Sequence, residues 1–374
     1  MKKTVLAVIL LLFLPSIAFA QSVETVMNGL DFADFEGVLN ELGNAISIQE
    51  TVLSLAKGET VLSLQALMHG LFERVMAGLY GSVLRITRLV LPAVLCSLVN
   101  TFMQAEKQAL AKDITGYACF LMVAAVMVQD LSSHLTLSSD TVANMTRAMQ
   151  SLFPLLLGLL AAIGGTASAA FFQPAVVAAS GFMTSLIANV TLPCAVFQAV
   201  LVMLDHVADT IKVSRLSALF RQIGIWTLGV SFTVFIGVTL IQGLGTAAVD
   251  GISIRTAKYT IDNFVPIVGG MFADTVDTLV GCSLVIKNAL GLTGLVVLIG
   301  ICVGPMLQTL LSAFVYRLSA ALLQPAAESR MVHCIQDFSD VLMMLFIIQL
   351  SVAAMFVLLI AQMLIVGNMT VMLR

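Results

Sequence analysis

Long apolar blocks alternate with shorter polar connections over most of this chain. Between residues 86 and 366 the apolar blocks are almost free of charge, and they cover residues 89–103, 114–128, 152–163, 175–204, 223–244, 290–310 and 341–366. A soluble domain cannot bury this much apolar surface, because its exterior must stay polar. In a bilayer the same surface contacts hydrocarbon at little cost if each segment closes its own backbone hydrogen bonds as a helix. The pattern predicts an all-α, polytopic integral membrane protein with about seven to eight transmembrane helices and further interfacial amphipathic helices.

The composition fits a membrane protein. Hydrophobic residues make up 59% and charged residues 10% of the 374 positions, whereas soluble domains are about 25% charged. The formal net charge of −3, without a basic block, gives no basis for nucleic-acid binding. Six cysteines lie in or near apolar runs without a CxxC pair, so we expect buried thiols rather than a disulfide or zinc framework.

The first 20 residues have the three parts of a secretory signal peptide. Lys2 and Lys3 precede an apolar run over residues 4–17, and Ala18 and Ala20 then supply the small residues of a cleavage site. An uncleaved first anchor is the alternative, although the run is short for a full span. Either interpretation places residue 21 outside the cytoplasm.

Residues 21–81 form a predicted extracytoplasmic amphipathic segment, and residues 82–374 a multi-span membrane domain. In the segment, apolar residues recur at helical spacing, and eight acidic residues stand against only Lys57 and Arg74. An acidic translocated segment fits the positive-inside rule. Its helices are expected to pack on a partner, on the outer leaflet or on the protein's own membrane domain.

The positive-inside rule also gives a provisional topology. A first span over residues 86–103 runs inward to a connection with Lys107 and Lys112, and the next block returns to a polar connection over residues 130–150. Residues 175–204 are too long for one perpendicular crossing, so we expect a break near Pro193. Residues 205–222 then lie inside, either as an interfacial helix or as the extension of a spanning helix.

Two carboxylates stand out in an apolar, glycine-rich stretch. Asp274 and Asp277 share one helix face, and Lys287 is near enough in sequence to pair with either. Ionised carboxylates are costly at bilayer depth unless they face water or a partner. They therefore suggest the polar lining of a conduit, or a proton or cation site. The alternative is a re-entrant or interfacial segment that is wetted from outside.

Motifs of known enzyme classes are missing from the sequence. It contains no HExxH metal site, no Walker A loop and no membrane-protease GxSG or GxGD motif, and its four histidines are scattered. We therefore expect no catalytic residues, no cofactor and no metal. Any transport would draw on a gradient or on a separate ATPase.

One segment resembles a known family. Residues 254–283 read IRTAKYTIDNFVPIVGGMFADTVDTLVGCS, and residues 287–291 read KNALG. This stretch resembles the stage III sporulation protein AE family of endospore-forming bacteria, and the layout of nearly the whole chain is similar. The likeness rests on Arg255, Lys258, Asp262, Asn263, Pro266, Gly269, Gly270, Asp274 and Asp277. Of these, Arg255, Lys258, Asp262, Asp274 and Asp277 are the candidate polar lining or contact residues.

The resemblance implies a role in spore formation. Members are made in the mother cell and reside in the membrane around the engulfed forespore, together with the other stage III sporulation proteins, AA to AH. Opposite this assembly stands the forespore's stage II sporulation protein Q, and one member resembles a secretion ATPase. The expectation is a non-enzymatic subunit of a channel or secretion-like complex needed for late forespore development. The alternatives are an autonomous secondary transporter with a polar site near Asp274 and Asp277, and, with no complete catalytic set in view, an intramembrane enzyme.

Overall fold

The fold is known from a computed structural model. It describes residues 27, 32–41, 48–56, 76, 87–88, 90–95, 109–207, 212–264, 269–325 and 329–372, and all elements among them are helical. The expected signal peptide and the first expected span, residues 86–103, lie wholly or mostly outside the described residues. The all-α prediction is confirmed.

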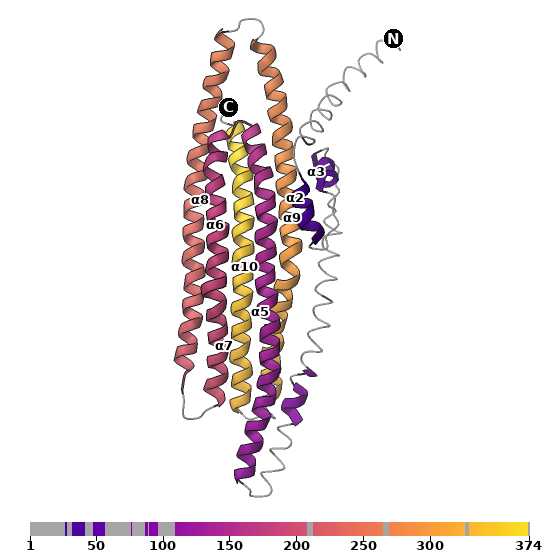
Figure 1. Ribbon diagram of the computed structural model, residues 1–374, viewed down its shortest axis with the longest axis vertical. Coiled ribbons are helices and arrows are strands. Elements are labelled where there is room, and N and C mark those ends of the chain that lie inside the picture. Colours follow the sequence, from indigo (N-terminus) through magenta and orange to yellow (C-terminus); the bar gives the residue numbers. More distant parts are fainter. Residues whose placement is uncertain are drawn as a thin grey trace, which may run out of the picture.

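An antiparallel bundle of very long helices forms the molecule (Figure 1). In chain order these are α5 (Ala109–Ala162), α6 (Thr166–Leu186), η1 (Ile187–Thr191), α7 (Leu192–Val207), α8 (Ser214–Phe264), α9 (Gly269–Leu323) and α10 (Ser329–Met372). Because α6, η1 and α7 form one continuous helical rod, the described part of the bundle consists of five long rods. At 1.5 Å per residue, the 54 residues of α5 extend about 81 Å, far beyond the 30 Å or so of bilayer hydrocarbon.

Five of these helical stretches are long and apolar enough to cross a membrane. The predicted number of seven to eight spans is not confirmed among the described residues. Part of the difference lies in residues 130–150, which were expected to be an exposed connection but lie inside α5. The blocks 114–128 and 152–163 therefore belong to one helix, because a polar helix face and a polar loop have similar hydropathy.

The expected break near Pro193 is replaced by a local widening of the helix. Residues Ile187–Thr191 form one π-helical turn, and the N–H of Leu192 donates to the carbonyl of Ile187. Since Pro193 has no N–H to donate, a shift of the hydrogen-bond ladder just before it keeps the rod continuous. The chain then turns and α8 begins at Ser214, so residues 214–222 extend a spanning helix and do not form a separate interfacial one.

The C-terminal helix α10 lies at the centre of the bundle, in contact with α5, α7, α8 and α9. Small residues let the helices approach, as is usual where lipid provides no hydrophobic driving force. A Cβ on Gly294 of α9, for example, would lie 2.3 Å from Cδ2 of Leu152 on α5. Two short helices of the amphipathic segment pack outside this bundle, α2 (Ala33–Glu41) against α5 and α3 (Ile48–Ala56) against α9.

At one end of the bundle, a tight turn joins α5 to α6. Gly164 has φ +97°, a conformation that side chains on Cβ disfavour. Asp250 of α8, 1% exposed, accepts hydrogen bonds from the N–H groups of Ala167 at 2.8 Å and Ser168 at 2.9 Å. This carboxylate caps the N-terminus of α6 and so fixes it against α8. Of the described long helices, α8 and α9 alone continue beyond this level, as a projecting hairpin (Figure 1).

The expectation for the cysteines holds only in part. Cys194, Cys282, Cys302 and Cys334 are buried free thiols, as predicted. At Cys119 the prediction is wrong, because this residue is disulfide-bonded. Sequence spacing does not reveal which cysteines the fold brings together.

Candidate functional site

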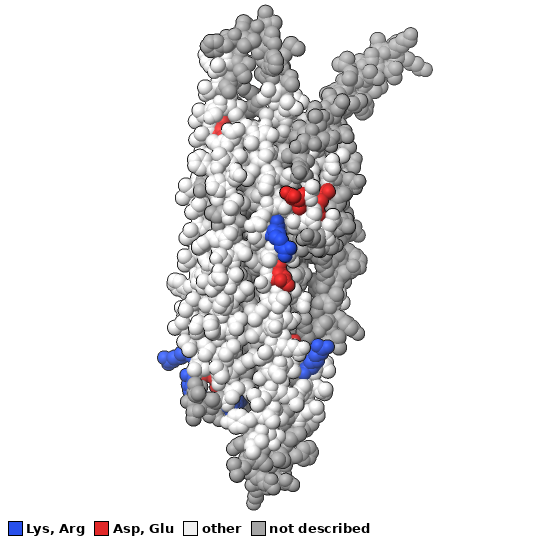
Figure 2. Space-filling model, viewed as in Figure 1, with Lys and Arg blue, Asp and Glu red and all other residues white. Residues whose placement is uncertain are grey.

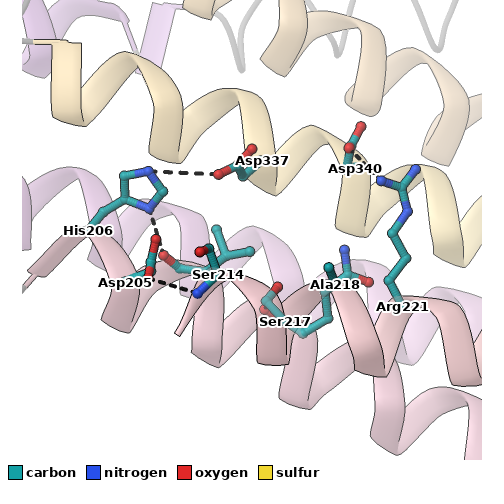
Figure 3. Close-up of a pocket in the computed structure, with 10 residues that line it drawn as sticks. Asp205, His206, Ser214, Ser217, Ala218, Arg221, Asp337 and Asp340 are labelled. Atoms are coloured by element: carbon teal, nitrogen blue, oxygen red, sulfur yellow. Dashed lines mark hydrogen bonds and ion pairs between the residues drawn. The ribbon is translucent and has the colours of Figure 1, made fainter. Parts of the chain in front are cut away.

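A polar pocket of about 190 Å³ lies at the end of the bundle opposite the projecting hairpin (Figure 3). It forms where α7 turns into α8 beside the first turns of α10. Its lining comprises Gln198, Val202, Asp205, His206, Ser214, Ser217, Ala218, Arg221, Asp337 and Asp340.

Asp340 of α10 is the central charge of this pocket. Its Oδ2 accepts from the guanidinium of Arg221 on α8 at 2.8 Å, and its Oδ1 from that of Arg317 on α9 at 3.1 Å. The side chains of Arg221 and Asp340 are 39% and 27% exposed, so water partly screens the pair. One carboxylate thus connects three helices.

Asp205 and His206 lie in the last turn of α7, just before the connection to α8. Asp205 Oδ1 accepts from the N–H groups of Val213 and Ser214, the latter at 2.8 Å, and so caps the start of α8. The ring of His206 donates from Nδ1 to the carbonyl of Val202 at 2.8 Å and faces Asp337 with Nε2 at 3.7 Å. A serine-type triad needs one imidazole nitrogen on a carboxylate and the other on a nucleophile. Here a backbone carbonyl takes the second nitrogen, so His206 is not arranged as a base for Ser214 or Ser217.

Arg330 closes the same end of the bundle from the start of α10. Its guanidinium donates to the carbonyl oxygens of His206 and Val207, the last residues of α7. It also lies over the rings of Tyr117 and Phe120 on α5, 5.3 Å and 6.0 Å from their centroids. With Arg330 and Asp340 together, this polar end ties all the long helices to α10.

The pocket is therefore suited to holding helix ends together. Its acids and bases are matched with one another or with backbone groups. Among the described residues, no cluster of three His, Cys, Asp or Glu is placed to hold a metal ion.

A buried lysine lies near the other end of the bundle, toward the projecting hairpin. Lys287 of α9 is 1% exposed, and its Nζ donates to the carbonyls of Leu364 at 3.1 Å and Met363 at 3.4 Å on α10. The expected pairing with Asp274 or Asp277 is thus replaced by backbone oxygens. Those acids lie 10 to 13 residues away on the same helix, roughly 15–20 Å along its axis.

The candidate residues from the sequence lie in the projecting hairpin. Arg255, Lys258 and Asp262 belong to the last turns of α8, and Asp274 and Asp277 to the first turns of α9. Arg255 and Asp277 are exposed; the side chains of Lys258, Asp262 and Asp274 lie outside the described residues. None of the five lines the polar pocket.

Sequence reasoning missed the pocket residues, although it singled out residues 205–222 as a charged connection. The informative signal was the group of charges that flank apolar blocks at two alternate connections: Asp205, Arg221, Arg317, Arg330 and Asp340. Charges at alternate connections of an antiparallel bundle meet at one end.

Comparisons with known proteins agree on one family. The sequence model of the family described as stage III sporulation protein AE matches residues 46–367. Stage III sporulation protein AE of Bacillus subtilis (strain 168) is 31% identical over 361 residues, which cover 95% of this chain and 89% of that relative. No solved structure matches. Since both matches extend over most of the helical bundle, the chain belongs to the stage III sporulation protein AE family.

Proposed function

We propose that this chain is a non-enzymatic membrane subunit of the stage III A sporulation complex, a channel or secretion-like apparatus that links mother cell and forespore. Family membership across residues 46–367 carries the proposal. The bundle supports it, because five of its described helical stretches are long and apolar enough to span a membrane. Its partners are the other stage III sporulation proteins, AA to AH, and indirectly the forespore's stage II sporulation protein Q.

The charge distribution suggests an orientation in the mother-cell-derived membrane. The pocket end carries Lys212, Arg215, Arg221, Arg317 and Arg330, whereas Arg255 and Lys258 are the basic residues of the hairpin. By the positive-inside rule the pocket end faces the mother-cell cytoplasm. With the expected inward span at residues 86–103, the chain then crosses six times, and the hairpin enters the space between the two membranes.

Deletion of the gene in its own spore-forming host tests the proposal. We expect development to stop after engulfment, with late forespore gene expression lost and rescued by the intact chain. A tagged chain should co-purify with other stage III A proteins from detergent-solubilised sporulating cells. Normal spore yield after deletion would contradict the proposal.

The transporter alternative makes a different prediction. A secondary transporter binds its substrate near the bilayer midplane, whereas Asp274 and Asp277 lie toward the projecting end of α9. Ion-coupled uptake by the purified chain alone in liposomes would favour the transporter over a subunit that needs partners.

A further inference from the structure

The outward face of α5 is polar along the middle of the bundle. All eight exposed residues of α5 between positions 129 and 150 are polar, and they define the α5 polar face: Gln129, Ser132, Ser133, Thr136, Ser139, Asp140, Arg147 and Gln150. Single positions or adjacent pairs recur at intervals of three, four or seven, which places them on one side of the helix. Figure 2 shows a charged patch over α5 halfway along a surface that is otherwise mostly uncharged.

Contacts with neighbouring helices place this face at bilayer depth. At its lower end, Asp130 accepts a hydrogen bond from Tyr316 Oη at 2.7 Å, close to the level of the pocket. Farther along, Gln349 Nε2 donates to Ser138 Oγ at 2.7 Å, and Gln349 lies well inside the apolar run 341–366 of α10. Thr146 Oγ1 lies 3.1 Å from Thr184 Oγ1, within another candidate span.

The charged pocket prevents a different placement of the membrane. Residues 114–128 of α5 are apolar, and sliding the bilayer toward them would take the polar face out of it. That shift would bury Asp337, Asp340 and Arg221 in hydrocarbon, where ionised groups are costly. The run 341–366 of α10, about 39 Å long, already spans the roughly 30 Å of bilayer hydrocarbon and reaches into both interfacial regions.

Other helices present apolar residues to the outside at the same depth. A Cβ on Gly224 of α8 would lie 2.1 Å from Met344 Cε, and one on Gly243 would lie 3.1 Å from Val366 Cγ2, so this part of α8 runs beside the apolar run of α10. Its exposed residues include an α8 apolar stripe: Trp226, Val230, Val234, Val238 and Ile241. Over residues 286–316 and 341–366, α9 and α10 expose Leu292, Ile299, Phe314, Leu350 and Ile365. These faces suit lipid, and the α5 polar face does not.

We propose that the α5 polar face borders a water-filled conduit through the membrane, whereas the α8 apolar stripe contacts lipid. The inference rests on the proposed function, because one helix cannot enclose water and the opposite wall must come from another protein of the assembly or a further copy of this chain. Hydroxyl and amide groups dominate the face, so it can hydrogen-bond to water and to passing solutes without a strong preference for cations or anions. On the rod beside α5, exposed Ser185 and Asn189, 3.0 Å apart, extend the polar surface at the depth of Thr184.

Cysteine accessibility tests the proposal in membranes from sporulating cells that hold the assembled complex. Single variants Ser133→Cys, Thr136→Cys and Ser139→Cys are compared with Val230→Cys, Val234→Cys and Val238→Cys, with labelling of the parent chain subtracted. The probe is a charged methanethiosulfonate reagent, which reacts with thiolates in water. We expect labelling of the α5 positions to be about tenfold or more faster than that of the α8 positions.

Equal, slow labelling at both sets would overturn the proposal, whether lipid or a packed protein covers α5. Fast labelling at both sets would overturn it too, because α8 would then not face lipid. Spore yield of the same strains is measured separately and reports on the proposed function. A chain that is dispensable for sporulation but labels on α5 would refute the function and leave the water-facing surface standing.

Discussion

At the scale of single residues, Lys287 and Gly367 illustrate how a charge is accommodated inside the bundle. A Cβ on Gly367 would lie 1.8 Å from Lys287 Nζ, so glycine leaves the space that the ammonium uses to reach two carbonyls of α10. The lysine is satisfied by hydrogen bonds to the backbone of a neighbouring helix. Its position depends on the glycine, which no feature of the sequence near Lys287 reveals.

This pair gives a double-mutant prediction. Gly367→Ala should lower the free energy of unfolding in detergent by about 1–3 kcal/mol, because the ammonium must leave its site. In a Lys287→Met background the same change should cost clearly less, since the crowded atom is gone. Thermal unfolding of the four proteins measures the coupling. Gly304→Ala, with nothing within 4 Å of the added Cβ, is the matched control; equal losses in both backgrounds would refute the coupling.

Asp250 carries a second prediction at this scale. Asp250→Ala removes the cap of α6 and leaves the buried N–H of Ser168 and the half-buried N–H of Ala167 without this acceptor, so it should cost about 1–3 kcal/mol of unfolding free energy. Asp250→Asn keeps one acceptor oxygen and should cost less. Melting temperatures in detergent give the order, with Asp140→Ala on the exposed surface of α5 as control. A harmless Asp250→Ala would mean that the α6 terminus finds other partners.

At the scale of elements, the projecting hairpin separates the family-specific residues from the structural pocket. The stretch that carries the resemblance, residues 254–283, coincides with the end of α8 and the start of α9. Exposed apolar side chains also lie there, among them Ile252, Tyr259 and Leu279. A surface that mixes exposed apolar and charged residues beyond the bundle is typical of a contact with another protein.

We therefore predict that Asp274→Asn combined with Asp277→Asn weakens assembly of the complex. Loss of two carboxylates at a partner contact should lower co-purification of the neighbouring stage III A proteins and spore yield roughly tenfold, the equivalent of about 1.4 kcal/mol. Immunoblots must show an unchanged amount of the chain. Thr256→Ala, on the same hairpin, is the control, because its hydroxyl donates within its own helix to the carbonyl of Ile252. Unchanged spores at unchanged protein level would remove both the lining and the contact role of these acids.

At the scale of the whole molecule, the all-helical membrane fold could be predicted from the sequence, but the bounds of the individual helices could not. Apolar blocks such as residues 341–366 predict membrane helices because lipid leaves the backbone few other choices. Hydropathy could not show that polar residues 130–150 continue α5, since the water-filled conduit that we propose for them needs a second protein or a further copy of the chain. Nor could it locate the pocket, because Arg221, Arg317 and Asp340 meet only after three helices align. An irregularity near Pro193 was expected as a break of the helix, but the structure has a π-helical turn at Ile187–Thr191 and the helix continues.

The orientation of the whole bundle provides the last prediction. Successive long helices are antiparallel, so α10 ends at the end of the bundle opposite the charged pocket (Figure 1). If the basic pocket end is cytoplasmic, a reporter fused after Met372 lies outside the cytoplasm. Alkaline phosphatase, which needs an oxidising compartment, should therefore be active there, whereas a phosphatase inserted after Lys212 should be inactive. The reverse pattern would invert the bundle and place the hairpin in the mother cell. Activity at both positions would mean that the chain between them crosses the membrane an even number of times, which the three antiparallel helices α8, α9 and α10 do not allow.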